Sequence, residues 1–269
     1  MRSAVLRGRE HTDLGAIAAV AEDGVAIALS RGGAPKTYGH TDPNEDAAAF
    51  AIGAAGSLLA VADGHSGFEA AEVAVEHLVH HPAPQWTGEE ELGPEAFHRQ
   101  AVAALCDANA EILRERVQGM NLLSETTLAA AVIRPDQRQL SYLCMGDSHL
   151  FVAARDGTVQ ELGVWEGRGT PFLGQPDETP ERLGETTRVG CRPLADLRAV
   201  VCVTDGLSEV GVGVPDPPAT IAELVLAYTR EPPELRPLRL AREICERANA
   251  AHGQGRSGDN VAVAVAWLD

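Results

Sequence analysis

The chain has 269 residues, 45% of them hydrophobic, which is enough to bury a sizeable core in a single domain spanning residues 1–269. Its 22 lysines and arginines against 39 aspartates and glutamates give a formal net charge of −17, which excludes general attraction to a nucleic-acid backbone. The sequence has neither the roughly 18 uncharged apolar residues of a membrane helix nor the apolar core of a signal peptide. We therefore expect a monomeric cytoplasmic protein with no nucleic-acid or membrane partner.

The five cysteines are scattered along the chain and form no close pair. This spacing argues against both a disulfide framework and a zinc site built from thiolates. The cysteines are therefore expected to be core residues.

The N-terminal part of the chain begins without periodicity, and residues 1–14 are predicted to be a loose leader. Residues 16–20 and 25–29 flank Glu22-Asp23-Gly24, a pattern typical of two strands joined by a hairpin turn. Residues 31–43 are rich in glycine, proline and polar residues, which predicts a loop.

The apolar run at residues 58–62 is predicted to form a buried strand that leaves the core at Asp63. Gly64 allows the backbone to turn sharply and to approach a ligand closely, and residues 69–81 continue as an alanine-rich helix. One corner is thus expected to hold a carboxylate, a free carbonyl and His65.

His77 and His81 lie four residues apart on that predicted helix and could ligate a metal ion together. Histidines in the last turn of a helix more often only complement the helix dipole. The metal site is therefore the minor interpretation.

Residues 95–118 have apolar positions at spacings of three and four, which predicts the longest helix, covering one face of a sheet. Short apolar runs joined by turns over residues 126–159 predict an antiparallel meander. Residues 163–190, rich in glycine and proline, are predicted to form an irregular surface flap.

The C-terminal part begins with a predicted buried strand over residues 197–203, which ends just before Asp205. Two helices are predicted over residues 221–228 and 238–250, and a last strand over residues 261–268.

Four aspartates in Asp-Gly or Gly-Asp pairs abut strongly apolar strands, whereas such a pair by itself usually marks only a turn. They are Asp63, Asp147, Asp205 and Asp259. Carboxylates at the ends of adjacent buried strands could converge, and their repulsion would raise their pKa values unless a cation neutralised them. Because all of these donors are oxygens, the pattern predicts magnesium or manganese rather than zinc or copper.

Six motifs then carry a resemblance to a known family. They are Asn44-Glu45-Asp46-Ala47, Val61-Ala62-Asp63-Gly64-His65-Ser66-Gly67, Thr126-Thr127, Gly146-Asp147-Ser148, Thr204-Asp205-Gly206-Leu207-Ser208-Glu209 and Gly258-Asp259-Asn260. From about residue 44 onward, the chain resembles the metal-dependent (PPM, or 2C-type) serine/threonine protein phosphatases of the bacterial type.

The resemblance implies an α+β fold, a four-layer α-β-β-α sandwich of two antiparallel sheets flanked by helix pairs. It implies hydrolysis of phosphoserine or phosphothreonine by a hydroxide that bridges two Mg²⁺ or Mn²⁺ ions. The implied partner is a phosphoprotein substrate, so that the enzyme would counter a serine/threonine kinase.

The family's metal ligands carry over onto matching positions of this chain. The resemblance implies that Asp63 bridges both ions, that the Gly64 carbonyl binds one, and that Asp205 and Asp259 hold the other. Asp46 would act beside the Asp63 bridge.

Three further roles follow from the resemblance. Asp147 would help to bind a third, weaker ion, and residues 163–190 would form the variable flap near the substrate. His65 would be the general acid that protonates the departing seryl or threonyl oxygen, a role that imidazole suits near neutral pH.

One departure from the family concerns phosphate binding. Bacterial members usually carry an arginine that clamps the phosphate five residues before the position of Asp46, and this chain has Thr41 there. Lys36, His40 or Arg31 could reach in from the same loop, so we take Lys36, His40 and Thr41 as possible phosphate contacts.

The missing arginine leaves two alternatives open. One is a catalytically weak pseudophosphatase that acts as a metal-stabilised phosphoprotein-binding module, and the other is a hydrolase of small phosphate esters. Retention of His65, which a binding module would not need, favours the active protein phosphatase.

Overall fold

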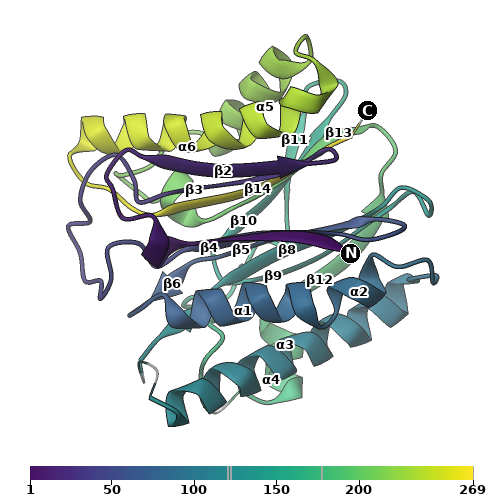
Figure 1. The fold of residues 1–269 in the computed structure, drawn as a ribbon, viewed down its shortest axis with the longest axis horizontal. Coiled ribbons are helices and arrows are strands. Elements are labelled where there is room, and N and C mark those ends of the chain that lie inside the picture. The colour runs from purple at the N-terminus through teal and green to yellow at the C-terminus, as the bar shows by residue number, and fades with distance from the viewer. Residues whose placement is uncertain (120, 122, 177, 269) are drawn as a thin grey trace.

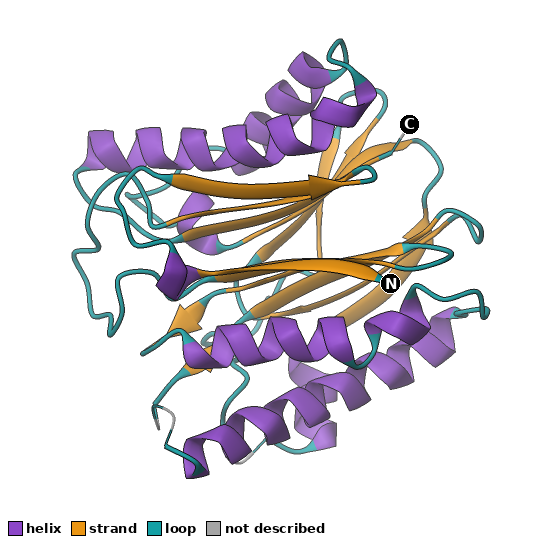
Figure 2. Cartoon of the chain, in the orientation of Figure 1, coloured by secondary structure: helices purple, strands orange, loops and turns teal. Residues whose placement is uncertain are grey.

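Two six-stranded sheets lie face to face in the computed structural model, which describes residues 1–119, 121, 123–176 and 178–268 (Figures 1 and 2). In spatial order, the first sheet consists of β1 (Arg2–Arg7), β4 (Ala47–Ile52), β5 (Ser57–Ala62), β8 (Leu128–Arg134), β9 (Gln139–Met145) and β12 (Arg188–Pro193). The second consists of β11 (Val159–Leu162), β10 (His149–Ala154), β13 (Leu197–Val203), β14 (Val261–Trp267), β3 (Val25–Ser30) and β2 (Ile17–Glu22). All pairings within the two sheets are antiparallel.

Helices cover the outer face of each sheet (Figure 1). The first sheet packs against α1 (Glu69–His80) and α3 (Pro94–Val117), with the short α2 (Ala83–Trp86) and α4 (Pro180–Thr186) beside them. The second packs against α5 (Pro217–Tyr228) and α6 (Arg236–Gly255). The predicted α+β sandwich of four layers is therefore confirmed. Among the described residues, no helix is both long enough and apolar enough to cross a membrane.

The apolar run at residues 58–62 forms most of β5, which is buried on both faces. Leu58 and Ala60 belong to the core between the first sheet and its helices, whereas Leu59 and Val61 belong to the core between the two sheets. Successive side chains of a strand point to opposite faces, so an unbroken apolar run is what a strand in the middle of this sandwich requires.

The predicted hairpin is confirmed as β2 and β3, which pair from Glu22↔Val25 outward. Asp23 has a φ of 43° and Gly24 a φ of 83°, the left-handed conformations that a tight two-residue hairpin turn needs. Asp23 therefore serves the turn, as predicted.

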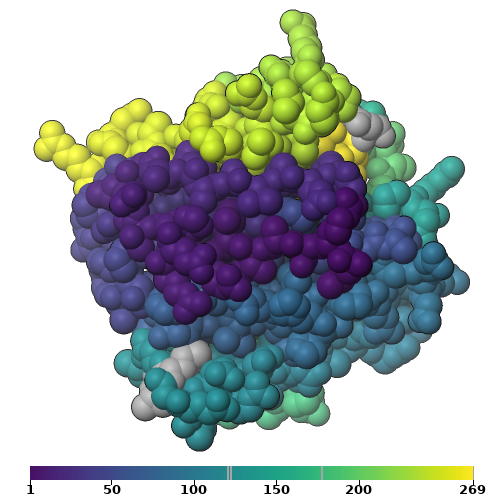
Figure 3. Space-filling model, in the orientation of Figure 1, coloured from purple at the N-terminus to yellow at the C-terminus, as the bar shows by residue number. Residues whose placement is uncertain are grey.

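The prediction of a loose leader is wrong for residues 2–7, because they form β1 and pair with β4 along its whole length. β1 lies at the edge of its sheet and buries only Leu6, so it lacks the apolar alternation by which a strand is detected. Figure 3 shows the N-terminal residues as a continuous band on this face of the molecule, between the C-terminal and the first helices.

Two hairpins of the meander predicted over residues 126–159 are confirmed, because β8 pairs with β9 and β10 pairs with β11. The predicted pairing between these hairpins is wrong, since β9 pairs next with β12 in the first sheet and β10 with β13 in the second. The chain crosses between the sheets at Gly146, whose φ is 97°. Spacing predicts that a turn occurs there, but the next strand can pair in either sheet.

The predicted flap is irregular over residues 163–176, but its second half contains α4 and the first half of β12. α4 is short and begins at Pro180, and the Thr179 hydroxyl caps it by accepting a hydrogen bond from the Arg182 N–H (3.3 Å). β12 is a half-exposed edge strand with only two apolar side chains, Val189 and Cys191, and this short pattern is too weak to predict a strand.

Ion pairs join the N-terminal residues to α1. Arg7 Nε donates to Glu76 Oε1 (2.6 Å), and Arg9 Nε lies 3.3 Å from Glu72 Oε1. Burial raises the pKa of Glu72 to about 7, although Arg9 and Arg7 act to lower it. In the folded state, burial therefore destabilises the ionised form of Glu72 by more than Arg9 and Arg7 stabilise it.

Glu72→Gln should stabilise the protein at pH 8. The folded pKa lies above the ordinary value of 4.5, so the folded state takes up a proton and stability falls as pH rises from 4.5 through about 7. The variant lacks this loss, and its free energy of unfolding should exceed that of wild type by up to about 3 kcal/mol at pH 8. Urea unfolding measures the gap, which should close towards pH 4.5. Glu76→Gln is the matched control, and a less stable Glu72→Gln at pH 8 would contradict the account.

Candidate metal centre and active site

Carboxylates from both sheets meet at one end of the sandwich. In the first sheet, Asp46 precedes β4 and Asp63 follows β5, and the first residue of β4 pairs with the last residue of β5. In the second sheet, Asp205 follows β13 and Asp259 precedes the neighbouring β14. Asp147 lies at the crossover between the sheets. Antiparallel pairing thus brings together side chains that are far apart in the sequence.

A cleft of about 270 Å³ holds this acidic group. Asp63, Asp147 and Asp205 each offer a carboxylate oxygen, and the three oxygens lie within 4.8 Å of one another. Asp259 and His65 also line the cleft. Oxygen donors at this spacing suit a hard divalent cation.

The carboxylates repel one another strongly. Burial raises the pKa of Asp63 well above its usual range, and the charges of Asp205 and Asp46 raise it further. Burial, followed by Asp259 and Asp147, does the same to the pKa of Asp205. A bound divalent cation would reverse this effect by stabilising the ionised forms.

Asp46 is also buried, and a bound cation would stabilise its ionised form in the same way. Its Oδ2 accepts a hydrogen bond from Thr204 Oγ1 (2.7 Å), but its Oδ1 has no hydrogen-bond partner within the part of the chain that the structure describes. Burial raises the pKa of Asp46 to about 7, even though Lys36 lowers it. An orphan acceptor facing other carboxylates is what a hard cation or its water would satisfy. The residues present therefore fit magnesium or manganese.

Lys36 brings a positive charge into the acidic cleft. Its Nζ lies 2.9 Å from Asp259 Oδ1 and 3.8 Å from Glu45 Oε2, and only 6% of the side chain is exposed. Burial alone would lower the pKa of Lys36, but the charges of Asp259, Asp46 and Asp63 raise it above its ordinary value. Lys36 is therefore protonated and is also the single lysine of the chain.

The backbone around Asp63 is fixed by a short ladder between β6 (Gly64–His65) and β7 (Glu125–Thr126). The Asp63 carbonyl accepts hydrogen bonds from Thr126 Oγ1 (2.8 Å) and from the Thr127 N–H (3.1 Å). A Cβ at Gly64 would lie 2.3 Å from the Glu45 carbonyl oxygen, so the position admits only glycine. The Thr126-Thr127 motif thus positions the Asp63 turn.

His65 lies at the rim of the cleft with 41% of its side chain exposed. Its Nδ1 is 3.8 Å from Asp63 Oδ2 and has no hydrogen-bond partner among the described residues. The irregular segment borders the same rim, since the Phe172 ring lies 4.6 Å from the His65 ring and Thr170 Oγ1 donates to Asp147 Oδ2 (3.0 Å).

The other two possible phosphate contacts lie outside this lining. His40 is exposed and its Nδ1 contacts the Tyr38 carbonyl oxygen (2.9 Å), while the Thr41 N–H donates to Glu45 Oε1 (3.0 Å). Arg31 does not line the cleft among the described residues, and its Nη1 instead donates a hydrogen bond to the Thr12 carbonyl (2.8 Å). Of the three possible phosphate contacts Lys36, His40 and Thr41, only Lys36 is among the described residues that line the cleft.

A family model described as Protein phosphatase 2C matches residues 35–245, which is most of the chain and includes four of the five clustered aspartates. The chain belongs to the protein phosphatase 2C family. Membership confirms the resemblance seen in the motifs and makes the chain a metal-dependent protein phosphatase by class. No curated protein matches the sequence.

Solved structures share the fold of this 2C-family chain. The Mycobacterium tuberculosis serine/threonine phosphatase PstP/Ppp is 25% identical, with 91% of this chain and 98% of that chain covered and a TM-score of 0.62. The catalytic domain of the serine/threonine protein phosphatase PstP in complex with two manganese ions is 22% identical, with 94% and 100% covered and a TM-score of 0.63. The S. agalactiae serine/threonine phosphatase is 17% identical, with 91% and 100% covered and a TM-score of 0.65.

Two motif residues to which the sequence assigned no role of their own hold the 2C-family site together. Asn260 Nδ2 donates to the Arg31 carbonyl (3.1 Å) and the Pro43 carbonyl (3.0 Å), and its Oδ1 accepts from the Glu45 N–H (3.0 Å). Glu45 in turn lies beside Lys36. Both residues are next to motif aspartates, and a long loop that returns to the same sheet edge needs such hydrogen bonds.

Proposed function

We propose that this 2C-family chain hydrolyses phosphoserine and phosphothreonine in phosphoproteins, with two Mg²⁺ or Mn²⁺ ions held in the acidic cleft. The observation that carries the proposal is the convergence of Asp63, Asp205 and Asp259 on one cleft with His65 at its rim. The PstP structure with two manganese ions supports a two-ion site in this fold.

The side chains that would hold the ions are those at the strand ends. Asp63 and the Gly64 carbonyl would hold the ions on the side of the first sheet, with Asp46 beside Asp63. Asp205 and Asp259 would hold them on the side of the second sheet. When bound, the ions supply an activated water and neutralise charge on the phosphoryl oxygens. Asp147, which is exposed and accepts a hydrogen bond from Thr170, would take part in a third, weaker ion site.

His65 would donate a proton to the oxygen of the departing serine or threonine. Its ring is half open to solvent and lies next to the carboxylate that would hold both ions, so a substrate in the cleft would meet it. Phe172 packs on the ring and restricts its orientation. A phosphoprotein that reaches this rim would lie next to Thr170 and Phe172.

Lys36 would bind the phosphoryl group in place of the family's arginine. Loss of a charge-assisted contact should lower kcat/KM for a phosphopeptide by about 10- to 100-fold in Lys36→Met, mainly through KM, whereas Lys36→Arg should retain most of it. Steady-state kinetics of the two variants measures the difference. An unchanged KM in Lys36→Met would exclude the phosphate contact.

The proposed setting is a cytoplasmic, monomeric, single-domain enzyme that counters a serine/threonine kinase. The five cysteines are free thiols, which suits a reducing compartment. All of the clustered carboxylates come from one chain, so the site needs no second copy.

The test compares a phosphothreonine peptide with a small aryl phosphate on the same manganese-loaded preparation. The proposal predicts turnover of both. Hydrolysis of the aryl phosphate alone would indicate a small-ester hydrolase, and manganese binding with no turnover of either would indicate a pseudophosphatase.

A further inference from the structure

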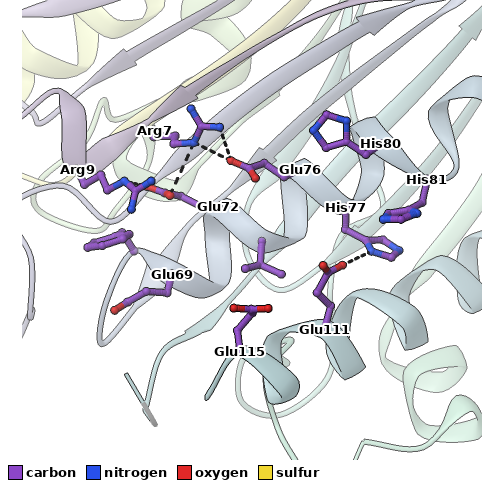
Figure 4. Close-up of a pocket in the computed structure, with 12 residues that line it drawn as sticks. Arg7, Arg9, Glu69, Glu72, Glu76, His77, His80, His81, Glu111 and Glu115 are labelled. Atoms are coloured by element: carbon purple, nitrogen blue, oxygen red, sulfur yellow. Dashed lines mark hydrogen bonds and ion pairs between the residues drawn. The ribbon is translucent and has the colours of Figure 1, made fainter. Parts of the chain in front are cut away.

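A second cluster of metal-binding side chains lies on the outside of the first sheet, where α1 and α3 meet. A cavity of about 450 Å³ opens there, lined by residues of both helices and by Arg7 and Arg9 (Figure 4). His77 and His81 come from the C-terminal end of α1, and Glu111 comes from the facing side of α3.

The three side chains point at one another. His77 Nδ1 lies 2.8 Å from Glu111 Oε2, and the His77 and His81 rings stack with centroids 4.5 Å apart at an interplanar angle of 30°. One ligand atom of each residue lies within 4.8 Å of those of the other two. In Figure 4 the His80 ring lies apart from this group.

We propose that His77, His81 and Glu111 form a second metal site, separate from the acidic cleft, that binds Zn²⁺. Two imidazoles and one carboxylate are a ligand set that zinc accepts in tetrahedral geometry, with water in the fourth position. Magnesium and manganese prefer all-oxygen sites such as the cleft, so the two sites differ in the ion they select.

The geometry needs only a small adjustment to close on an ion. Two ligand atoms bound to one zinc at about 2.0–2.2 Å lie about 3.4 Å apart in tetrahedral geometry, so the 2.8 Å contact between His77 Nδ1 and Glu111 Oε2 would have to widen slightly. His81 is exposed, so its ring can turn without disturbing the core. Arg114 Nη2 donates to Glu111 Oε1 (3.1 Å) and thereby orients the carboxylate while Oε2 faces the imidazoles.

Without metal, the His77–Glu111 pair already joins the two helices. That contact lowers the pKa of Glu111, first through its hydrogen bond with His77. Zinc would replace the pair by a three-residue link between α1 and α3. Binding should therefore raise the melting temperature, because an ion that binds only the folded state stabilises it by mass action.

Zinc titration in a large excess of Mn²⁺ tests the site, because excess manganese competes with zinc for the acidic cleft of the proposed function. Isothermal calorimetry should detect zinc binding in wild type and in His80→Ala, the matched control on the same helix. His81→Ala and Glu111→Gln should each weaken that binding by at least about 100-fold, because loss of a ligand costs more than loss of its supporting contacts. Both variants should keep the manganese-dependent activity of wild type, which separates this site from the proposed reaction.

Cobalt provides a second readout that does not depend on the binding heat. Co²⁺ held by imidazoles in tetrahedral geometry absorbs strongly in the visible range, and this absorption should be lost in His81→Ala and Glu111→Gln. Zinc affinity and cobalt absorption that match wild type in both variants would overturn the proposal. A loss of the same size in His80→Ala would overturn the assigned ligand set.

Discussion

Asp63→Ala should abolish manganese uptake at the acidic cleft and lower kcat by at least about a thousandfold, since metal ions supply several kcal/mol of transition-state stabilisation. Asp63 lies at the end of β5, within reach of both Asp147 and Asp205, so its carboxylate is central to the cluster. Isothermal calorimetry with Mn²⁺ and turnover of a phosphothreonine peptide measure the two effects on one preparation.

The control for Asp63→Ala is Asp107→Ala, which removes an exposed aspartate from α3 far from the strand ends. The control should bind manganese and turn over substrate as wild type does. In addition, metal-free Asp63→Ala should unfold at a higher urea concentration than metal-free wild type at pH 8, because burial and like charges raise the pKa of Asp63. Undiminished manganese uptake by Asp63→Ala would contradict the assigned ligands.

His65→Ala should slow hydrolysis of a phosphothreonine peptide by about 10²- to 10⁴-fold, the usual contribution of a positioned general acid. An activated aryl phosphate has a leaving group that needs no proton, so its hydrolysis should change little. The ratio of the two kcat values therefore reports the role of His65 apart from any general loss of activity.

The control for His65→Ala is His98→Ala, an exposed histidine of α3 that should leave both rates unchanged. Equal losses on the two substrates in His65→Ala, with manganese affinity intact, would exclude a general-acid role. A loss of manganese affinity would instead point to a structural role beside Asp63.

The sequence predicts the layers of this fold well, because strands buried on both faces leave unbroken apolar runs. β5 and β14 are such strands, and α3 has a clear helical period. Edge strands cannot be found in this way: β1 and β12 are half exposed, contribute only a few apolar side chains to the cores, and pair with β4 and β9 through their backbones. The sequence also does not show which sheet the strand after Gly146 joins, because backbone pairing decides its partner.

The candidate site is predictable in its aspartates because each one ends or begins an apolar strand within a short motif. Antiparallel pairing then makes their convergence a consequence of topology. The sequence could not decide which of Lys36, His40 and Thr41 lines the cleft, since the 31–43 loop takes its shape from hydrogen bonds of Asn260 more than two hundred residues away. His77 and His81 gained a third partner only through the packing of α1 on α3.

The most direct test of the central claim is the metal dependence of phosphothreonine-peptide hydrolysis, measured on chelator-treated protein with and without added Mn²⁺, beside Asp205→Ala. We predict turnover that appears with manganese in wild type and is absent from Asp205→Ala under both conditions. Turnover that persists after chelation, or that Asp205→Ala shares with wild type, would contradict a metal-dependent phosphatase centred on this cleft.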